Sequence, residues 1–325
     1  MPTIVIAYAD FPDTTVETDI LKAIDATLVP LAGLETPEQL EAARQADGLM
    51  VTIQSVPASL LNSMARCRIV SRVGTGLDAI DIPAATARGI WVTNVPDYAV
   101  DEVSTHAITL LLALARRLPR MLESTRQGVW DSRLARPFPR LRGQTLGVLG
   151  FGRIARATAA KGRGLGLEVI AHDPYVSAQA IEALGVRAVD ADSLWRESDF
   201  VSLHTPLTEG TRQVVNAQTL ARMKPTAFLI NTARGALVDE AALLQAVRSG
   251  RIAGAALDVL SPEPPPPDHP LLHDERILIT PHYAWYSEAA NREVRVSAAE
   301  EIVRVLRGER PRCPANQILD QRKEN

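Results

Sequence analysis

Short apolar runs of strand length alternate with segments of helical periodicity from the start of the chain. Strands and helices that alternate in this way form β-α-β units with a parallel sheet. We therefore expect a first α/β domain. Its expected strands are Thr3–Tyr8, Thr27–Pro30, Gly48–Gln54, Arg68–Val73 and Ile90–Val95, and its expected helices are Val16–Ala26, Pro37–Ala46, Ala58–Arg66 and Ile82–Ala87.

A second series of the same kind begins near Thr145. Its apolar runs are continuous rather than alternating in polarity, as in strands that helices cover on both faces. The chain should therefore form two doubly wound parallel-sheet domains of the α/β class. The expected strands of this series are Leu146–Leu149, Val169–His172, Phe200–Leu203, Ala227–Asn231, Gly254–Leu257 and Ile277–Thr280.

Two further segments indicate how the domains are connected. The apolar-rich helical segment Asp101–Leu118 and the proline-broken run Arg136–Pro139 stand between the two series and predict an arm. The segment Ser287–Gly308 has helical periodicity without a following strand, so we expect it to cross back onto the first domain. We place one discontinuous domain at residues 1–98 and 283–325 and the other at 99–282, with the arm near 101–142.

The composition is that of a soluble globular protein, with 325 residues, 46% of them hydrophobic, and a net charge of −3. This balance gives no support for binding to nucleic acid or to an anionic membrane. Cys67 and Cys313 are too few and too far apart to predict a disulfide framework or a metal site. No basic leader precedes Thr3–Tyr8 and no run reaches about 18 apolar residues, so we expect a cytoplasmic protein.

The run Thr145–Ala155 combines a strand, a glycine-rich turn and the start of a helix. Gly150 permits the tight turn, Gly152 lets the backbone approach a pyrophosphate, and the helix amides face the anion. Asp173 ends the next apolar run about 20 residues later, where a carboxylate binds ribose hydroxyls and repels a 2′-phosphate. The pattern predicts NAD rather than NADP as the cofactor; a plain strand-helix turn is the alternative.

Three later strands end close to residues that suit acid–base chemistry, namely Arg234, Glu263 and His282. Parallel strands deliver their carboxyl ends to one rim, so these side chains should meet there. Arg234 can clamp a carboxylate and polarise a neighbouring carbonyl. His282 can give a proton when a ketone is reduced and remove it in reverse, while Glu263 would fix its tautomer and favour the protonated ring. Taken singly, a surface ion pair or a helix cap is the alternative.

With these residues in place, the chain resembles the D-isomer-specific 2-hydroxyacid dehydrogenase family over nearly its whole length. The segment His282–Glu288 is similar to the C-terminal-binding protein (CtBP-like) branch. The resemblance implies a Rossmann NAD-binding domain, a flavodoxin-like substrate domain, an active site in the cleft between them, and homodimers formed through the arm. It implies an NAD-dependent D-2-hydroxyacid dehydrogenase (EC 1.1.1.-) that acts on a small 2-keto or 2-hydroxy acid.

The resemblance also implies roles for single residues. Arg234 would bind the substrate carboxylate, Glu263 would orient His282, and His282 would act as acid and base. Asp258 would contact the nicotinamide carboxamide. Motif and resemblance together predict cofactor contacts at Thr75, Gly150, Phe151, Gly152, Arg153, Ile154, Asp173, Thr205, Pro206, Thr211, Thr232, Ala233 and Asp258, and substrate contacts at Gln54, Val73, Gly74, Thr75, Gly76, Arg234 and Trp285.

Departures from the family pattern leave the substrate open. Gln54 is neutral where phosphoglycerate-oxidising relatives place a phosphate ligand, although Arg72 keeps phosphoglycerate dehydrogenase as an alternative. Glu263 argues against formate oxidation, since formate dehydrogenases use glutamine there. Trp285 could line a pocket for a bulky 2-keto acid, or it could pack as a core residue.

A different class of function also stays open. The Trp285 segment allows an NAD(H)-sensing, corepressor-like interaction protein, which would tolerate the loss of His282. The proline run Pro262–Pro267 predicts a stiff loop, either at the active site or for binding a partner. His106 and His204 are expected to be structural or close to the cofactor.

Overall fold

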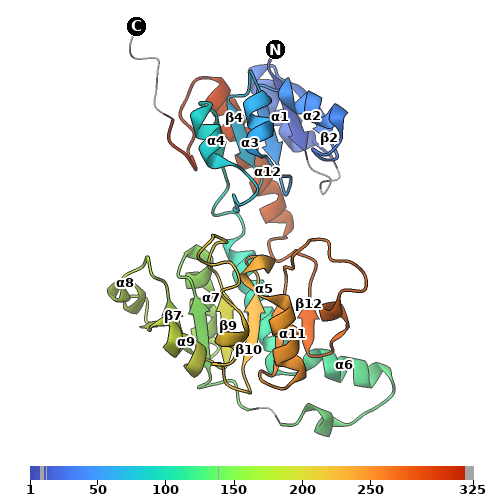
Figure 1. The fold of residues 1–325 in the computed structure, drawn as a ribbon, viewed down its shortest axis with the longest axis vertical. Helices are drawn as coiled ribbons and strands as arrows, with labels where there is room; N and C mark the ends of the chain where they lie inside the picture. Colours follow the sequence, from blue (N-terminus) through green and yellow to red (C-terminus); the bar gives the residue numbers. More distant parts are fainter. Residues whose placement is uncertain (8–10, 12, 138, 319–325) are drawn as a thin grey trace. The chain divides into compact units, whose positions relative to one another are not determined.

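The computed structural model describes residues 1–7, 11, 13–137 and 139–318. The chain divides into two compact units, Met1–Tyr98 with Ser287–Asn325, and Ala99–Tyr286 (Figure 1). It returns to the first unit at Ser287, whereas the sequence placed this crossing at residue 283, because the intervening residues are tied to Asp258 of the second unit. The predicted strand end at Tyr8 and the last positions, 319–325, lie outside the described residues.

The first unit contains a five-stranded parallel sheet in the order β2-β1-β3-β4-β5. This is the order of flavodoxin-like sheets, so the expected fold is confirmed. The third strand is shorter than predicted, because the Thr52 amide and hydroxyl turn to the side-chain oxygen of Gln54. The strands are β1 (Thr3–Ala7), β2 (Thr27–Leu31), β3 (Gly48–Val51), β4 (Ile69–Arg72) and β5 (Trp91–Thr93).

Helices cover both faces of this sheet and bury an apolar layer on each. One layer lies under α2 (Pro37–Arg44), α3 (Ala58–Ser63) and α4 (Ile82–Ala87). The other lies under α1 (Thr15–Leu21) and α12 (Glu288–Leu306), so the predicted return of the C-terminal helix is confirmed.

Hydrogen bonds from β4 and its preceding residue fix α12 on the sheet. The Ser71 hydroxyl donates to the Ala298 carbonyl at 3.0 Å. The Arg68 guanidinium donates to the carbonyls of Leu306 and Val305, at 3.0 and 2.8 Å. The Arg68 bonds add donors to carbonyls in the last turn of α12, where intrahelical donors run out.

The second unit contains a seven-stranded parallel sheet in the order β12-β11-β10-β9-β6-β7-β8. With β6 counted as the first strand, this is the Rossmann order with one additional strand, β12, at the edge. The strands stay parallel, but the order in which the chain adds them reverses between β6 and β9, and this position is the switch point of the sheet. The two-residue edge strand β8 carries too little pattern to be predicted. The strands are β6 (Thr145–Leu149), β7 (Glu168–His172), β8 (Arg187–Ala188), β9 (Phe200–Leu203), β10 (Phe228–Asn231), β11 (Gly254–Leu257) and β12 (Ile277–Ile279).

Two helical layers also enclose this sheet (Figure 1). The predicted helix over Asp101–Leu118 ends early, because Arg117 takes a left-handed φ of +48° and a new helix begins with Pro119 in its first turn. One layer holds α5 (Val100–Ala115), α7 (Arg153–Gly164) and α8 (Ala178–Glu182), and the other holds α9 (Ala191–Glu197), α10 (Ala217–Leu220) and α11 (Glu240–Arg248); α6 (Leu118–Arg126) extends the arm.

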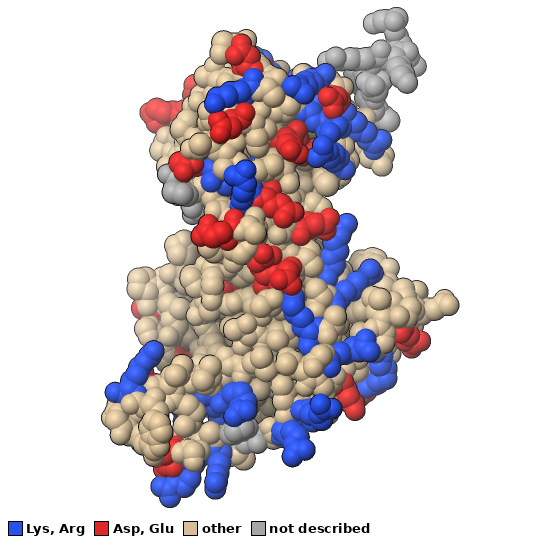
Figure 2. All heavy atoms as spheres, turned by 180° about the vertical axis from the view of Figure 1, so that it is seen from behind, with Lys and Arg blue, Asp and Glu red and all other residues tan. Residues whose placement is uncertain are grey.

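The surface carries charges of both signs. On the face drawn in Figure 2, basic and acidic side chains occur on each unit. Among the described residues, none of the helices combines the length and the apolar character needed to cross a membrane.

Candidate active site

The glycine-rich turn between β6 and α7 has the backbone that a dinucleotide requires. Gly150 has φ +87°, a conformation that side chains rarely allow. A Cβ on Gly150 would lie 2.8 Å from the carbonyl carbon and oxygen of His204 and 2.9 Å from the Thr205 amide nitrogen. The turn therefore passes directly against the end of β9, at the switch point of the sheet.

The N-terminus of α7 is open to an anion. Gly152 is its N-cap, no side chain caps it, and its first turn holds no acidic residue. A Cβ on Gly152 would meet no other segment of the described chain within 4 Å. The helix dipole and the amides of the first turn favour negative charge there. These residues fit a pyrophosphate, and the predicted contacts Arg153 and Ile154 begin the same helix.

Asp173 follows β7 and anchors the glycine-rich turn. Its carboxylate accepts hydrogen bonds from the amides of Phe151, at 2.7 Å, and Tyr175, at 2.8 Å. Each oxygen keeps a further lone pair for a ribose hydroxyl. The Phe151 side chain is fully buried in the core, so it packs under the turn rather than facing a ligand.

The other predicted cofactor residues of this unit lie on the loops after β9 and β10. The Thr211 hydroxyl donates to the Pro206 carbonyl at 2.6 Å and accepts from the Thr208 amide at 2.7 Å, which closes the loop that begins at Thr205. Beyond β10, beside Ala233, the Thr232 hydroxyl is buried and has no hydrogen-bond partner among the described residues. An unsatisfied buried hydroxyl of this kind suits a polar group of a ligand.

Arg234 lies on the turn after β10. Its guanidinium donates to the Ala233 carbonyl at 2.7 Å, and the Asn231 side chain supports the turn by donating to the Arg234 carbonyl at 2.8 Å. The following residue, Gly235, has no room for a side chain, because a Cβ would lie 2.1 Å from the Leu260 carbonyl. This close approach brings the Arg234 turn against the loop that carries Glu263.

Glu263 and His282 form a direct pair. The Glu263 Oε2 atom lies 2.5 Å from His282 Nδ1, and its Oε1 atom accepts the Leu260 amide at 2.9 Å. Both side chains are about one-third exposed, at 32% and 36%. The carboxylate therefore fixes the Nδ1 side of the ring and leaves Nε2 for proton exchange with a ligand.

Asp258 holds the turn that carries His282, a contact that the sequence did not indicate. Its side chain is 1% exposed. One oxygen accepts from the Thr280 hydroxyl at 2.5 Å and the Tyr283 amide at 3.2 Å, and the other accepts from the Ala284 amide at 2.9 Å. The predicted role of Asp258 toward nicotinamide stays a prediction; its visible contacts fasten both flanks of His282.

Two more histidines pack close to these groups. His106, on α5, lies 3.1 Å from the Thr280 hydroxyl, and burial lowers its pKa although the Asp258 carboxylate opposes that shift. The His204 ring contacts the Ser202 hydroxyl at 2.9 Å, and burial lowers its pKa to about 4. The His204 ring is therefore neutral at physiological pH. The contact of His204 with Ser202 suits the structural role expected for it. The contact of His106 with Thr280, beside Asp258, was not predicted from the sequence.

The predicted substrate loop lies in the first unit, after β4. Gly74 has φ +144°, and a Cβ there would lie 1.3 Å from a terminal nitrogen of Arg72, so the Arg72 guanidinium covers this glycine. That guanidinium donates to the Val73 carbonyl at 2.6 Å, and the Thr75 hydroxyl donates to the Val95 carbonyl at 3.1 Å. These two hydrogen bonds fix the loop from Val73 to Gly76 to the backbone around it. Gln54, the other predicted substrate contact of this unit, follows β3 of the same sheet.

Trp285 lies between the His282 turn and the start of α12. The Trp285 ring is partly buried and meets the Tyr286 ring edge-on, with centroids 5.4 Å apart. The pocket and core interpretations of Trp285 both stay predictions. Within the described part of the chain, no group of three or more histidine, cysteine or acidic residues is placed to hold a metal ion.

A comparison with protein families matches residues 108–284 to the NAD binding domain of D-isomer specific 2-hydroxyacid dehydrogenases. Among curated proteins, the chain is 38% identical to the D-3-phosphoglycerate dehydrogenase of Methanocaldococcus jannaschii, with 85% of this chain and 53% of that protein covered. It is 38% identical to the glyoxylate reductase of Korarchaeum cryptofilum, with 86% and 85% covered. The chain thus spans about half the length of the phosphoglycerate dehydrogenases it matches.

Solved structures give the same picture. The TT0316 protein from Thermus thermophilus superposes with a TM-score of 0.87 and 33% identity, covering 97% of this chain and all of that one. D-lactate dehydrogenase from Aquifex aeolicus, solved with NAD and lactic acid, gives a TM-score of 0.85 and 27% identity, covering 94% of this chain and 96% of that one.

Proposed function

The chain belongs to the D-isomer-specific 2-hydroxyacid dehydrogenase family, and on this premise we propose that it interconverts a 2-keto acid and its D-2-hydroxy acid with NAD. The NAD prediction is confirmed by the matched NAD binding domain. The observation that carries the proposal is the 2.5 Å contact between Glu263 and His282 in the same unit as the glycine-rich turn.

Each of the three polar residues has a role in this reaction. The Arg234 guanidinium binds the substrate carboxylate and polarises the neighbouring carbonyl. Protonated His282 gives its Nε2 proton to the carbonyl oxygen during reduction, and the neutral ring takes the hydroxyl proton during oxidation. Glu263 keeps the Nδ1 side of the ring bonded and balances the charge of the imidazolium.

NADH supplies the hydride when it is bound. Residues of the second unit hold this cofactor in the proposal. Gly152 and the start of α7 would hold the pyrophosphate, and Asp173 would accept hydrogen bonds from the ribose hydroxyls. Thr205, Pro206, Thr211, Thr232, Ala233 and Asp258 line the rest of the cofactor site in this proposal. Thr75 stays a prediction from the family resemblance.

The substrate in this proposal is an unphosphorylated 2-keto acid. Gln54, Val73–Gly76 and Trp285 stay contacts predicted from the family resemblance. The neutral Gln54 supports it, because its side-chain oxygen accepts from Thr52 and offers no positive charge to a phosphate. Phosphoglycerate oxidation is the second candidate, favoured by the 38% identity to a D-3-phosphoglycerate dehydrogenase.

A substrate panel tests both candidates. Purified protein and NADH are mixed with glyoxylate, hydroxypyruvate, pyruvate, longer and aromatic 2-keto acids and phosphohydroxypyruvate, and NADH oxidation is followed. Turnover of an unphosphorylated acid supports the proposal, whereas turnover of phosphohydroxypyruvate alone selects the second candidate. No turnover of any acid, with NADH still bound, contradicts both and favours the NAD(H)-sensing alternative.

A homodimer is the assembly that we propose. Four large apolar side chains lie exposed on the arm, Leu118, Leu122, Val129 and Trp130, the last with 93% of its surface accessible. Exposed apolar side chains grouped on one segment mark an interaction surface. The similarity to the CtBP-like branch remains a prediction from residues 282–288.

A further inference from the structure

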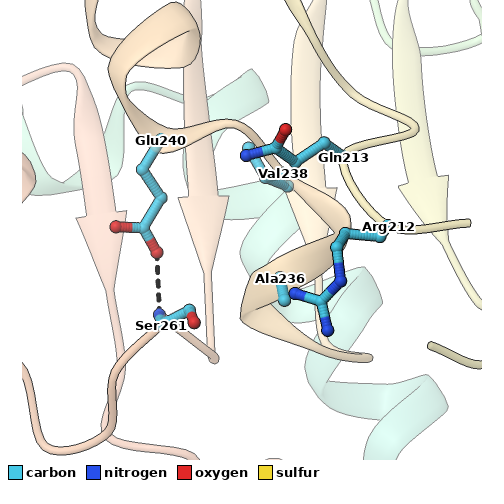
Figure 3. Close-up of a pocket in the computed structure, with 6 residues that line it drawn as sticks. All are labelled: Arg212, Gln213, Ala236, Val238, Glu240 and Ser261. Carbon is cyan, nitrogen blue, oxygen red and sulfur yellow. Dashed lines mark hydrogen bonds between the residues drawn. The ribbon is translucent and has the colours of Figure 1, made fainter. Parts of the chain in front are cut away.

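The loop between β11 and the short helical turn Pro270–His273 is attached to one carboxylate at two places. Glu240, at the start of α11, accepts the Ser261 amide on its Oε1 atom at 2.8 Å (Figure 3). Its Oε2 atom lies 3.0 Å from His269 Nε2. Ser261 and His269 stand at opposite ends of the segment that contains Glu263, so Glu240 clasps both ends of that segment.

The loop needs such a clasp because it has few donors of its own. Five of the six positions from 262 to 267 are proline, and proline has no amide hydrogen. Its hydrogen bonds include the Leu260 amide to Glu263, the His269 amide to the Pro266 carbonyl and the contact of His273 with the Pro267 carbonyl. Because so few amides remain, an acceptor outside the loop that binds the Ser261 amide and the His269 ring contributes much of what holds it in place.

Glu240 is available for this task because its neighbour caps the helix. The Asp239 carboxylate accepts the Ala242 amide at 3.0 Å, which satisfies the N-terminus of α11. The Glu240 side chain instead reaches across to the loop, and both it and His269 are only 16% exposed. Figure 3 shows Glu240 with Ser261 on the wall of a small pocket of about 210 Å³ that Arg212 and Gln213 also line.

We propose that Glu240 is a positioning residue for proton transfer, which acts by holding the loop so that Glu263 meets His282. The inference rests on the proposed function, since it concerns the proton that His282 exchanges. Glu240 acts through the backbone at Ser261, two residues before Glu263, and through the His269 side chain, six residues after it. It is not among the proposed substrate or cofactor contacts. Without the clasp, the Glu263 carboxylate would lose its fixed distance to His282 Nδ1.

The variant Glu240→Ala tests this role. Reduction should slow by about ten- to a hundredfold in kcat, the effect expected when a catalytic group is displaced by about 1 Å. The dissociation constant for NADH should not change, because the glycine-rich turn is intact. Glu240→Gln keeps an acceptor for the Ser261 amide and an amide for His269, so it should restore most of the rate. Glu275→Ala, an exposed acidic residue of the same unit, is the matched control.

Coupling distinguishes positioning from general support of the fold. In a Glu263→Gln background, Glu240→Ala should cost much less than it does in the native chain, since its effect passes through Glu263. Equal costs in the two backgrounds would overturn the inference. If Glu240→Ala does not fold, His269→Phe removes one arm of the clasp and an Nδ1 atom that has no hydrogen-bond partner among the described residues; an unchanged kcat there would also overturn it.

A readout without turnover separates this inference from the proposed function. In protein labelled with ¹⁵N-histidine, the Nδ1 proton shared by His282 and Glu263 should give a strongly downfield signal, assigned by its loss in His282→Asn. Glu240→Ala should broaden or remove that signal. If the signal is lost as expected while no 2-keto acid is reduced, the proposed function fails and the clasp stands. If turnover exists and the signal and rate survive, only the clasp fails.

Discussion

His282 has a left-handed backbone, with φ +52°, which is uncommon for a residue with a side chain. Such a conformation costs on the order of 1–3 kcal/mol and persists where surrounding contacts determine it. Here the His282 amide donates to the carbonyls of Asp258 and Thr280, at 2.8 and 3.0 Å. The turn therefore aims the ring toward Glu263 at the expense of local stability.

The first prediction concerns His282 itself. Replacement by asparagine should lower the reduction rate by about 10²- to 10⁴-fold, the usual contribution of a general acid. The variant should also oxidise a 2-hydroxy acid more slowly by a similar factor, because the same ring removes the hydroxyl proton. Steady-state rates in both directions measure this, and unchanged rates in the variant would contradict the role.

A second prediction compares the two glycines of the turn. Gly150→Ala places a Cβ 2.8 Å from the His204 carbonyl at a positive φ, so the free energy of unfolding should fall by about 2 kcal/mol or more. Gly152→Ala meets open space, so stability should change by less than about 0.5 kcal/mol. Gly152→Ala should nevertheless weaken NADH binding at least about tenfold, because its methyl group enters the pyrophosphate site. Urea unfolding and NADH fluorescence titration measure the pair; tight NADH binding by Gly152→Ala would refute the cradle.

His204 gives a third prediction, on the pH dependence of stability. Burial lowers its pKa from 6.5 to about 4, so between these values the unfolded chain takes up a proton that the folded chain does not. Stability should therefore fall as pH drops from 6.5 toward 4, by on the order of 3 kcal/mol from this group, and be unaffected above 6.5.

Comparison of variants isolates the His204 contribution. In His204→Asn the loss of unfolding free energy between pH 6.5 and 4 should be smaller than in the native chain. His273→Asn changes an exposed residue and should show the native loss. Unfolding free energies measured at several pH values test this. If the free energy falls equally in His204→Asn and in the native chain, the effect does not come from His204.

At the scale of elements, the ends of β10, β11 and β12 deliver Arg234, Glu263 and His282. The sequence predicted this from the order of strands in a doubly wound sheet, because parallel strands end at one edge. The contacts that fix these side chains were not predictable, since they join loops distant in sequence. Gly235 against Leu260 and Asp258 beneath the His282 turn are examples, and both depend on backbone geometry that no local pattern encodes.

A fourth prediction concerns the two helices on one face of the first sheet. Arg295 of α12 donates to both oxygens of Glu17 of α1, at 2.6 and 2.7 Å, and Glu17 is fully buried. Glu17→Gln should cost about 3 kcal/mol of unfolding free energy, because the buried Arg295 guanidinium loses its close carboxylate, while its contact to the Asp13 carboxylate is longer, at 3.4 Å. The double variant Glu17→Leu/Arg295→Met should cost less than Glu17→Gln alone.

An exposed ion pair on the same helix provides the control. Asp19 pairs with Lys22 at 2.8 Å, with 64% and 70% of the side chains exposed, so Asp19→Asn should cost less than about 1 kcal/mol. Denaturant unfolding compares the three variants. Equal losses for Glu17→Gln and Asp19→Asn would mean that the buried pair does not hold α12 to the sheet.

At the scale of the whole molecule, the exposed apolar arm predicts a dimer. Trp130→Glu combined with Leu122→Glu should convert the protein to a monomer, because each buried charge would oppose the apolar contact. Light scattering coupled to size-exclusion chromatography measures the mass. Tyr175→Glu is the control, since Tyr175 is 95% exposed and lies outside the arm. A native protein that runs as a monomer would remove the dimer from the proposal.

The sequence by itself determined the two parallel sheets, the NAD fingerprint and the three catalytic candidates, because strand periodicity, glycine spacing and strand order are local or follow from topology rules. Only the tertiary structure decided which side chains hold turns and loops in place. Asp258 and Phe151 face inward, Asp173 bonds the glycine-rich turn, and Glu240 grips a loop from another element. Such contacts depend on how loops that are distant in the chain pack together, and hydrogen bonds in a folded interior form wherever that packing places donor and acceptor.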